Sequence, residues 1–158
     1  MILICGGAGY IGSHVNKLLF REGRQTLVLD NFVRGHRQAC RWGSLAQGDI
    51  GDADFLNEVF TRHKICAVMH LCAYSCVGES VLKPELYYEN NVKNTVTLLN
   101  AMARHGVRDF IFSSSAAVFG APDKMPLDEN STLAPVNPYG RTKLMVEKLL
   151  PDYAKAHG

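Results

Sequence analysis

Residues 2–12 read Ile2-Leu3-Ile4-Cys5-Gly6-Gly7-Ala8-Gly9-Tyr10-Ile11-Gly12, an apolar run followed by glycines spaced three apart. The apolar run predicts a strand, and the residues after Gly9 open a helix. Gly6 permits a tight turn, Gly9 lets backbone N–H groups approach a phosphate, and Gly12 allows the helix to pack closely on the strand. The helix dipole favours an anion at the same point. The stretch predicts a pyrophosphate-binding turn, and a purely structural tight turn is the alternative interpretation.

Short apolar runs and helical patterns alternate along the rest of the chain. We expect strands at residues 2–5, 26–30, 45–47, 67–71 and 109–113, and helices at 10–21, 53–63, 84–105 and 138–157. This alternation predicts right-handed crossovers and a Rossmann-type α/β fold, a doubly wound parallel sheet with strand order 3-2-1-4-5. We expect one domain over residues 1–158 whose sheet is incomplete at its carboxyl-terminal edge, and a long loop over 121–136.

The composition favours a soluble globular chain without nucleic-acid or membrane partners. The 158 residues are 47% hydrophobic and 20% charged, which is too apolar for a disordered chain. Lys plus Arg number 17 against 15 Asp plus Glu, a net charge of +2, and no basic run forms a patch for a phosphate backbone. No apolar stretch approaches the ~20 residues of a membrane span, and no signal peptide is recognisable. We therefore expect a cytoplasmic protein.

The cysteines do not suggest a metal site. The chain has five, an odd number with no C-x-x-C pair, which suits reduced thiols. Cys72 and Cys76 lie four apart, but no second ligand pair accompanies them. We expect the cysteines to pack as thiols and no metal to bind.

Asp30 is the residue that predicts the cofactor. It ends the second expected strand, 18 residues after Gly12, where a carboxylate accepts hydrogen bonds from both adenosine ribose hydroxyls. Because the same carboxylate repels a 2′-phosphate, NAD is favoured over NADP. Arg34 and Arg37 follow and would weaken that preference if they faced the ribose; we expect them in a solvated loop.

Asp49 and Ile50 follow the third expected strand and have two interpretations. They flank the adenine, with Asp49 accepting from its exocyclic amine, or Asp49 is the N-cap of the helical segment that begins at Asp52.

A second group of residues predicts acid–base chemistry. Tyr139 and Lys143 are four apart after Pro138, so they share one face of a helix. A neighbouring ammonium favours the phenolate, which makes Tyr139 a usable base. Residues 113–115 are three serines at the end of the fifth expected strand, at the edge where open α/β sheets bind ligands. Spacing alone does not choose among these serines, and the others would cap the following turn.

Taken together, these motifs resemble the extended short-chain dehydrogenase/reductase superfamily, and within it the amino-terminal part of the UDP-galactose 4-epimerases. The similarity covers nearly all 158 residues. Its most specific parts are Val77-Gly78-Glu79-Ser80-Val81 with Pro84, Tyr87-Tyr88-Glu89-Asn90-Asn91-Val92, and 137–147. In this family Ser115 would be the catalytic hydroxyl, Tyr139 the base, and Lys143 a contact of the nicotinamide ribose.

The resemblance also implies a set of NAD-binding residues. Periodicity alone does not choose between Asn90 and Asn91, and the family pattern favours the first. The implied residues are Gly6, Gly9, Tyr10, Ile11, Gly12, Asp30, Asn31, Asp49, Ile50, Leu71, Ala73, Ser75, Asn90, Ser113, Tyr139 and Lys143.

The activity that the resemblance implies is NAD-dependent 4-epimerisation of a UDP-hexose, UDP-glucose to UDP-galactose, through a 4-keto intermediate. A UDP-pentose or UDP-uronic acid 4-epimerase, or a non-catalytic NAD-binding or oligomerising fragment, are the alternatives. Dehydration is disfavoured, because Ala116-Ala117 stands where the related dehydratases have Asp-Glu. The chain would be the NAD-binding domain alone, inactive without a substrate-binding domain.

A homodimer on the helices at 84–105 and 138–157 is also implied. The first of these helices carries an apolar stripe that faces either the sheet or a partner helix: Tyr88, Val92, Val96, Leu99 and Ala103.

Three positions depart from the family pattern. Several members have Lys at the position of Ser75, so one positive contact to the pyrophosphate is missing. Ala117 and Phe119 replace a common Thr and Tyr, which removes two hydrogen-bond donors for the substrate.

Overall fold

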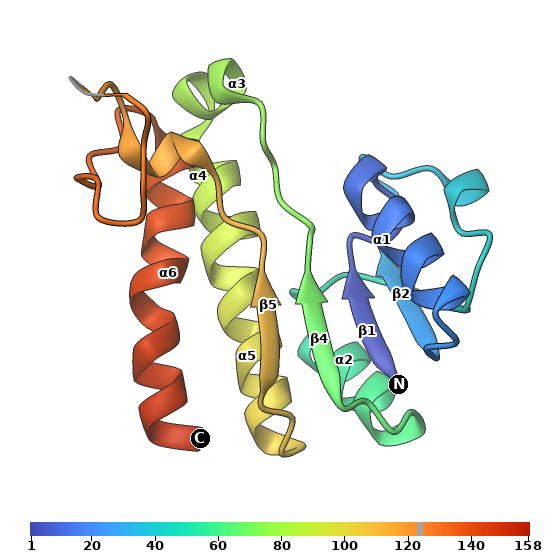
Figure 1. Ribbon diagram of the computed structural model, residues 1–158. Coiled ribbons are helices and arrows are strands. Elements are labelled where there is room, and N and C mark those ends of the chain that lie inside the picture. The colour runs from blue at the N-terminus through green and yellow to red at the C-terminus, as the bar shows by residue number, and fades with distance from the viewer. Residues whose placement is uncertain (123–124) are drawn as a thin grey trace.

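A parallel five-stranded sheet organises the described part of the chain, residues 1–122 and 125–158 of a computed structural model (Figure 1). All neighbouring strands are parallel and the order is β3-β2-β1-β4-β5, as the sequence predicted. The carboxyl ends of all the strands therefore meet at one edge of the sheet. The strands are β1 (Ile2–Cys5), β2 (Thr26–Asp30), β3 (Ser44–Gln47), β4 (Ala67–His70) and β5 (Asp109–Phe112).

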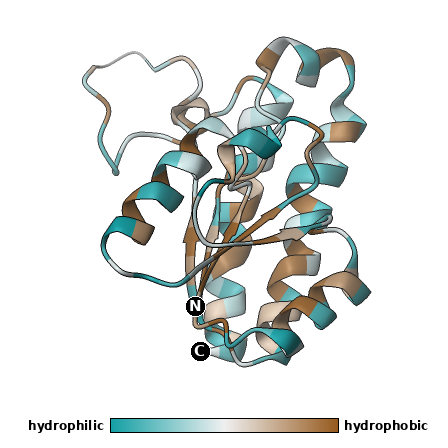
Figure 2. Cartoon of the chain, turned by 90° about the vertical axis from the view of Figure 1, so that its right-hand side faces the viewer, coloured by the Kyte–Doolittle hydropathy of each residue, from teal (hydrophilic) through white to brown (hydrophobic). Residues whose placement is uncertain are grey.

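Helices cover both faces of the sheet (Figure 2). The expected helices at 10–21, 53–63 and 138–157 form, the second ending one residue earlier than predicted. The six-residue helix at 77–82 was not predicted. The α-helices are α1 (Tyr10–Arg21), α2 (Ala53–Arg62), α3 (Val77–Leu82), α4 (Pro84–Tyr87), α5 (Asn94–Arg104) and α6 (Pro138–His157), with 3₁₀ turns η1 (Arg37–Ala39) and η3 (Ala116–Phe119).

The expected helix at 84–105 is not one regular α-helix. Between α4 and α5 the chain forms a π-helical segment, η2 (Tyr88–Lys93). The expected apolar stripe is also displaced by one residue, because the fully buried row contains the polar side chains of Asn91 and Thr95, which are hydrogen-bonded. That buried row is Tyr87, Asn91, Thr95, Leu98 and Met102. Of the predicted stripe only Leu99 is buried, and the rest is half-buried.

The main core lies between the sheet and helices α2 and α5. Leu3 and Leu27 point to this side and pack with Leu56 of α2 and Leu98 of α5, all at most 1% exposed. In Figure 2 the strands are coloured largely as hydrophobic and lie between the flanking helices. This packing holds the sheet rigid and leaves the loops at the carboxyl edge free to build a site.

The long loop expected over 121–136 has no helix or strand among its described residues; residues 123 and 124 lie outside the described part. In the described ranges, no helix combines the length and the apolar character that a membrane span needs.

Candidate functional site

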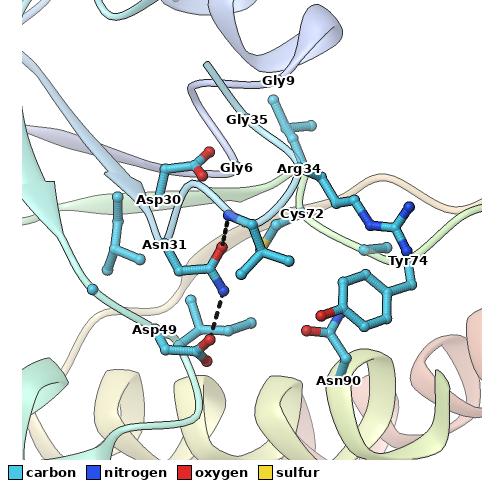
Figure 3. Close-up of a pocket in the computed structure, with 16 residues that line it drawn as sticks. Gly6, Gly9, Asp30, Asn31, Arg34, Gly35, Asp49, Cys72, Tyr74 and Asn90 are labelled. Atoms are coloured by element: carbon cyan, nitrogen blue, oxygen red, sulfur yellow. Dashed lines mark hydrogen bonds between the residues drawn. The ribbon is translucent and has the colours of Figure 1, made fainter. Parts of the chain in front are cut away.

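An open cleft lies at the carboxyl ends of β1, β2, β3 and β4 (Figure 3). Its volume is about 620 Å³ when the space open to solvent is included. The predicted cofactor residues that line it are Gly6, Gly9, Asp30, Asn31, Asp49, Ile50, Leu71, Ala73 and Asn90. The others lie outside it: Tyr10 and Ile11 are exposed on α1, Gly12 is buried, Ser75 is exposed, and Ser113, Tyr139 and Lys143 lie beyond the end of β5.

The glycine loop has the geometry of an anion cradle. Gly6 has φ of +82°, and a Cβ there would lie 2.7 Å from the Cys72 nitrogen. A Cβ on Gly12 would lie 2.1 Å from the Gly6 carbonyl oxygen, so α1 starts in direct contact with the turn. No side chain caps α1, and its first turn has no acidic residue. The first N–H groups of α1 are therefore open to an anion, which fits a dinucleotide pyrophosphate.

Asp30 is fixed beside the glycine loop. It is 8% exposed, and its carboxylate accepts from the N–H groups of Ala8 at 3.0 Å and Phe32 at 2.8 Å. Neither arginine expected in this loop pairs with it: Arg34 bonds Glu79, and Arg37 donates to Gln47. The carboxylate at the edge of the cleft is therefore not paired with either arginine and has lone pairs still available to a ribose.

Asp49 forms the opposite wall of the cleft. Its carboxylate accepts from Asn31 Nδ2 at 2.6 Å and from the Gly51 N–H at 2.7 Å (Figure 3). The N-cap of α2 is Asp52, which accepts from Asp54 and Phe55. The alternative interpretation of Asp49 as that N-cap was therefore wrong.

The two asparagines of the π-helical segment have different surroundings. Asn91 is 3% exposed; its Oδ1 accepts from the Tyr74 N–H at 2.9 Å and its Nδ2 donates to the Tyr74 carbonyl at 2.9 Å. It also donates to Thr142 Oγ1 of α6 at 3.2 Å. Asn90 lines the cleft instead. Asn91 therefore joins the loop after β4 to α6, and Asn90 is the asparagine that lines the cleft.

His70, which the sequence analysis did not assign to the site, lies under the cleft in a chain of hydrogen bonds. Thr95 donates its hydroxyl proton to the Asn91 carbonyl at 2.7 Å, so it accepts from His70 Nε2 at 2.8 Å. His70 Nδ1 is then unprotonated and accepts from the Cys72 thiol at 3.3 Å. Burial, reinforced by the charge of Lys143, lowers the pKa of His70 to about 3. Burial, with the charge of Asp30, raises the pKa of Cys72 to about 12.

Lys143 lies between the buried hydrogen bonds of His70 and the residues predicted for acid–base chemistry. It is 4% exposed, and its Nζ donates to the Ser113 carbonyl at 2.7 Å. The Nζ lies 6.0 Å from the centre of the Tyr139 ring. Burial lowers the pKa of Lys143 to about 8, and the nearby Cys72 acts in the opposite direction. Lys143 therefore carries a charge at neutral pH that it loses more readily than an ordinary lysine.

The three serines are not equivalent. Ser114 donates to the Glu147 carboxylate of α6. Ser115 caps η3 by accepting from the Ala117 N–H at 3.2 Å, which leaves its own proton free to donate. A Cβ on Gly140 would lie 2.5 Å from the Ala117 carbonyl, so the first turn of α6 packs directly on η3. This contact brings Ser115 and Tyr139 onto adjacent elements.

No cluster of His, Cys, Asp or Glu suited to a metal ion occurs among residues 1–122 and 125–158. All five cysteines are free thiols, and Cys5 is buried in the core.

Comparison with known families agrees with this geometry. Residues 2–158 match the family described as the NAD dependent epimerase/dehydratase family. The chain belongs to this family. The resemblance found in the sequence is confirmed.

Among curated relatives of this family member, the UDP-glucose 4-epimerase of Rhizobium leguminosarum bv. trifolii is 49% identical over 152 residues, 96% of this chain and 46% of that protein. The UDP-glucose 4-epimerase of Rhizobium meliloti (strain 1021) is 48% identical over 99% of this chain and 48% of its own length. The chain spans about half the length of the curated relatives it matches.

Solved structures of the same family superpose closely. The UDP-glucose 4-epimerase from Brucella ovis in complex with NAD gives a TM-score of 0.97 at 46% identity, covering 99% of this chain and 48% of that one. The enzyme from Stenotrophomonas maltophila with bound NAD and formylated UDP-arabinopyranose gives 0.95 at 36% identity, covering 99% and 49%. The parallel sheet is therefore the fold of this family.

Replacing His70 with Gln should weaken the dependence of stability on acid pH. The folded pKa of His70, about 3, lies below the usual 6.5, so the unfolded chain binds more protons between these values. Its contribution to the free energy of unfolding is complete above pH 6.5 and falls as the pH drops through this window, by about 1.5 kcal/mol between pH 6.5 and 5. Urea denaturation at both pH values measures it.

The matched control for this experiment is His36→Gln, on an exposed position of the loop after β2. Between pH 6.5 and 5 this variant should lose as much free energy of unfolding as the unmodified chain. If His70→Gln and the unmodified chain lost the same free energy of unfolding, His70 would bind equally many protons in the folded and the unfolded state, and the predicted effect would be wrong.

Proposed function

We propose that this chain binds NAD in the cleft at the carboxyl ends of β1–β4 and supplies the proton-transfer residues of a UDP-hexose 4-epimerase. The observation that carries the proposal is the uncapped start of α1, which faces the cleft through a glycine loop beside the buried carboxylate of Asp30. The relatives named above as UDP-glucose 4-epimerases, one of them solved with NAD, support it.

Each end of the cleft has a distinct task in this proposal. The first N–H groups of α1 hold the pyrophosphate, Asp30 accepts from the adenosine ribose, and Asp49 with Ile50 lies along the adenine. Asn90, Leu71 and Ala73 complete the wall on the side of β4.

Bound NAD supplies a hydride acceptor for carbon 4 of the sugar. Tyr139 takes the proton of the sugar 4-hydroxyl as general base, while the Ser115 hydroxyl donates a hydrogen bond to the same oxygen and keeps its own proton. Lys143, held by the Ser113 carbonyl, stabilises the phenolate through its charge and reaches the nicotinamide ribose. Return of the hydride to the other face of a 4-keto sugar would invert carbon 4.

A UDP-pentose is the second candidate substrate. The observation that favours it is the Stenotrophomonas maltophila structure, whose 36% identical chain holds formylated UDP-arabinopyranose. The absence of hydroxyls at Ala117 and Phe119 removes two donors that would otherwise select among sugars. A panel of UDP-sugars assayed with the longest product of the gene separates these candidates.

The proposed setting is a cytoplasmic homodimer. Half-buried Tyr88, Val92 and Val96 form an apolar row beside the buried face of η2 and α5. A partner's equivalent helices would cover this row, as in a four-helix contact.

We expect NAD to bind more tightly than NADP, because the 2′-phosphate of NADP would lie against the Asp30 carboxylate. Isothermal titration of both cofactors measures the preference, and Asp30→Asn should narrow it by about tenfold or more, the effect of removing a close charge repulsion. Asp49→Asn is the control, since it alters the adenine wall shared by both cofactors. Tighter NADP binding by the unmodified chain would refute the assignment of Asp30.

Tyr139→Phe should reduce epimerisation by about a hundredfold or more while NAD affinity is retained, because the ring remains and the ionisable oxygen is lost. The measurement is conversion of UDP-galactose by the longest gene product that contains these residues, together with NAD titration. Tyr153→Phe, on the same helix but bonded to Asn100, is the matched control. Substantial turnover by Tyr139→Phe would identify another group as the base.

The chain should sediment as a dimer at micromolar concentration. Val92→Glu places a charge in the proposed contact and should shift the equilibrium to monomer. Val81→Glu, at a 60% exposed position on α3, should leave the dimer intact. A monomer in the unmodified chain would refute the proposed contact.

A further inference from the structure

Arg34 makes a long-range ion pair that the proposed function does not use. Its Nη2 donates to both carboxylate oxygens of Glu79, at 2.9 and 2.7 Å. Its guanidinium carbon also lies 5.1 Å from the centre of the Tyr74 ring, a cation–π distance. Arg34 and Tyr74 both line the cleft, and the arginine side chain extends from its loop toward the tyrosine (Figure 3).

The two partners differ in how firmly they are held. Glu79 Oε2 accepts from the hydroxyl of Tyr87, a fully buried residue, at 2.8 Å. This hydrogen bond, with the charge of Arg34, lowers the pKa of Glu79 below its usual range. Tyr74 is fixed because its backbone N–H and its backbone carbonyl both form hydrogen bonds with the side chain of Asn91. The side chain of Arg34 is 58% exposed and that of Glu79 is 28% exposed, so Arg34 is the less constrained partner.

The position of the pair follows from the strand order. Arg34 stands in the loop after β2, and Glu79 stands in α3, which follows β4. In the sheet, β1 lies between β2 and β4, so the glycine loop after β1 lies between the two partners. The pair therefore joins the two sides of the cleft, whose lining includes Gly6 and Gly9 of the glycine loop.

We propose that Arg34 and Glu79 form a strap that closes the cleft over the phosphate-binding loop and slows the release of a bound dinucleotide. The inference rests on the proposed binding of NAD to this cleft. Arg34 is a positioning residue in this role, and Glu79 with Tyr74 is its anchor on the far wall.

The strength of the pair suits a strap that opens. A largely exposed ion pair changes an equilibrium by only about two- to fivefold, and salt screens it. The cofactor can therefore enter and leave, but each departure requires Arg34 to leave both the Glu79 carboxylate and the Tyr74 ring. An epimerase that regenerates its NAD in every cycle benefits from slow release.

The test measures the release of NADH from the 158-residue chain, followed by fluorescence after mixing with excess NAD. Arg34→Met keeps an apolar stem over Tyr74 without the charge, and Glu79→Gln keeps the contact to Tyr87. Each should accelerate release about two- to fivefold without slowing association. The double variant should release no faster than either single variant, because both changes open the same strap.

The dependence of NADH release on ionic strength is a second measurement. A purely structural role of the pair would not make the release rate depend on salt. Raising it from about 0.05 to about 0.5 M should accelerate release from the unmodified chain and leave both variants nearly unchanged. Arg62→Met and Glu58→Gln, from the exposed pair on α2, are the matched controls and should behave as the unmodified chain.

Two results would overturn the strap while leaving NAD binding intact. Unchanged release in Arg34→Met and Glu79→Gln would show that the pair does not retain the dinucleotide. Slower release in Glu79→Gln would show that Arg34 binds the dinucleotide itself and that Glu79 competes for it. Failure of the unmodified chain to bind NADH would instead refute the proposed function and the strap together.

Discussion

The contact between Gly12 and the Gly6 carbonyl is the constraint on which the site depends. A Cβ at Gly12 would lie 2.1 Å from that oxygen, so only glycine lets the first turn of α1 pack against the turn that follows β1. The turn held in this way receives the neighbouring loop: Ala8 donates to Asp30 and accepts from the His36 N–H at 3.0 Å. The glycine turn and the Asp30 carboxylate are thus joined by hydrogen bonds, and neither can shift without the other.

Buried polar groups fix the other wall, where the sequence would lead one to expect apolar packing. Asn91 and Thr95 replace two hydrophobic residues in the buried row of η2 and α5. Each polar atom of these side chains has a partner, so their burial costs little and they specify one register of helix against sheet. The same bonds hold Tyr74 and His70 at the end of β4, which couples helix packing directly to the cleft.

The sequence predicted the parts of the molecule that depend on local signals. The strand order and the glycine turn follow from runs of neighbouring residues, and they were found. Helix α3 was missed because six residues with no capping side chain leave little periodic signal. The displacement of the buried row has a different cause. A hydropathy pattern does not include hydrogen bonds, and Asn91 and Thr95 are buried with hydrogen-bond partners from distant segments of the chain. Ser75 was placed in the cleft by family position, yet its side chain is exposed outside it.

A buried lysine beside a buried histidine is tolerated here because only one of them is charged. The charge of Lys143 and burial together keep His70 neutral, and the bond from Thr95 to the Asn91 carbonyl fixes which ring nitrogen carries the proton. The unprotonated nitrogen faces Cys72, whose own burial keeps its thiol protonated and able to donate. The floor of the cleft is thus neutral, and the ammonium of Lys143 is directed at the Ser113 carbonyl next to Tyr139. Removing the proton from Lys143 above pH 8 would therefore remove the positive charge near the Tyr139 ring while leaving the glycine turn unaltered.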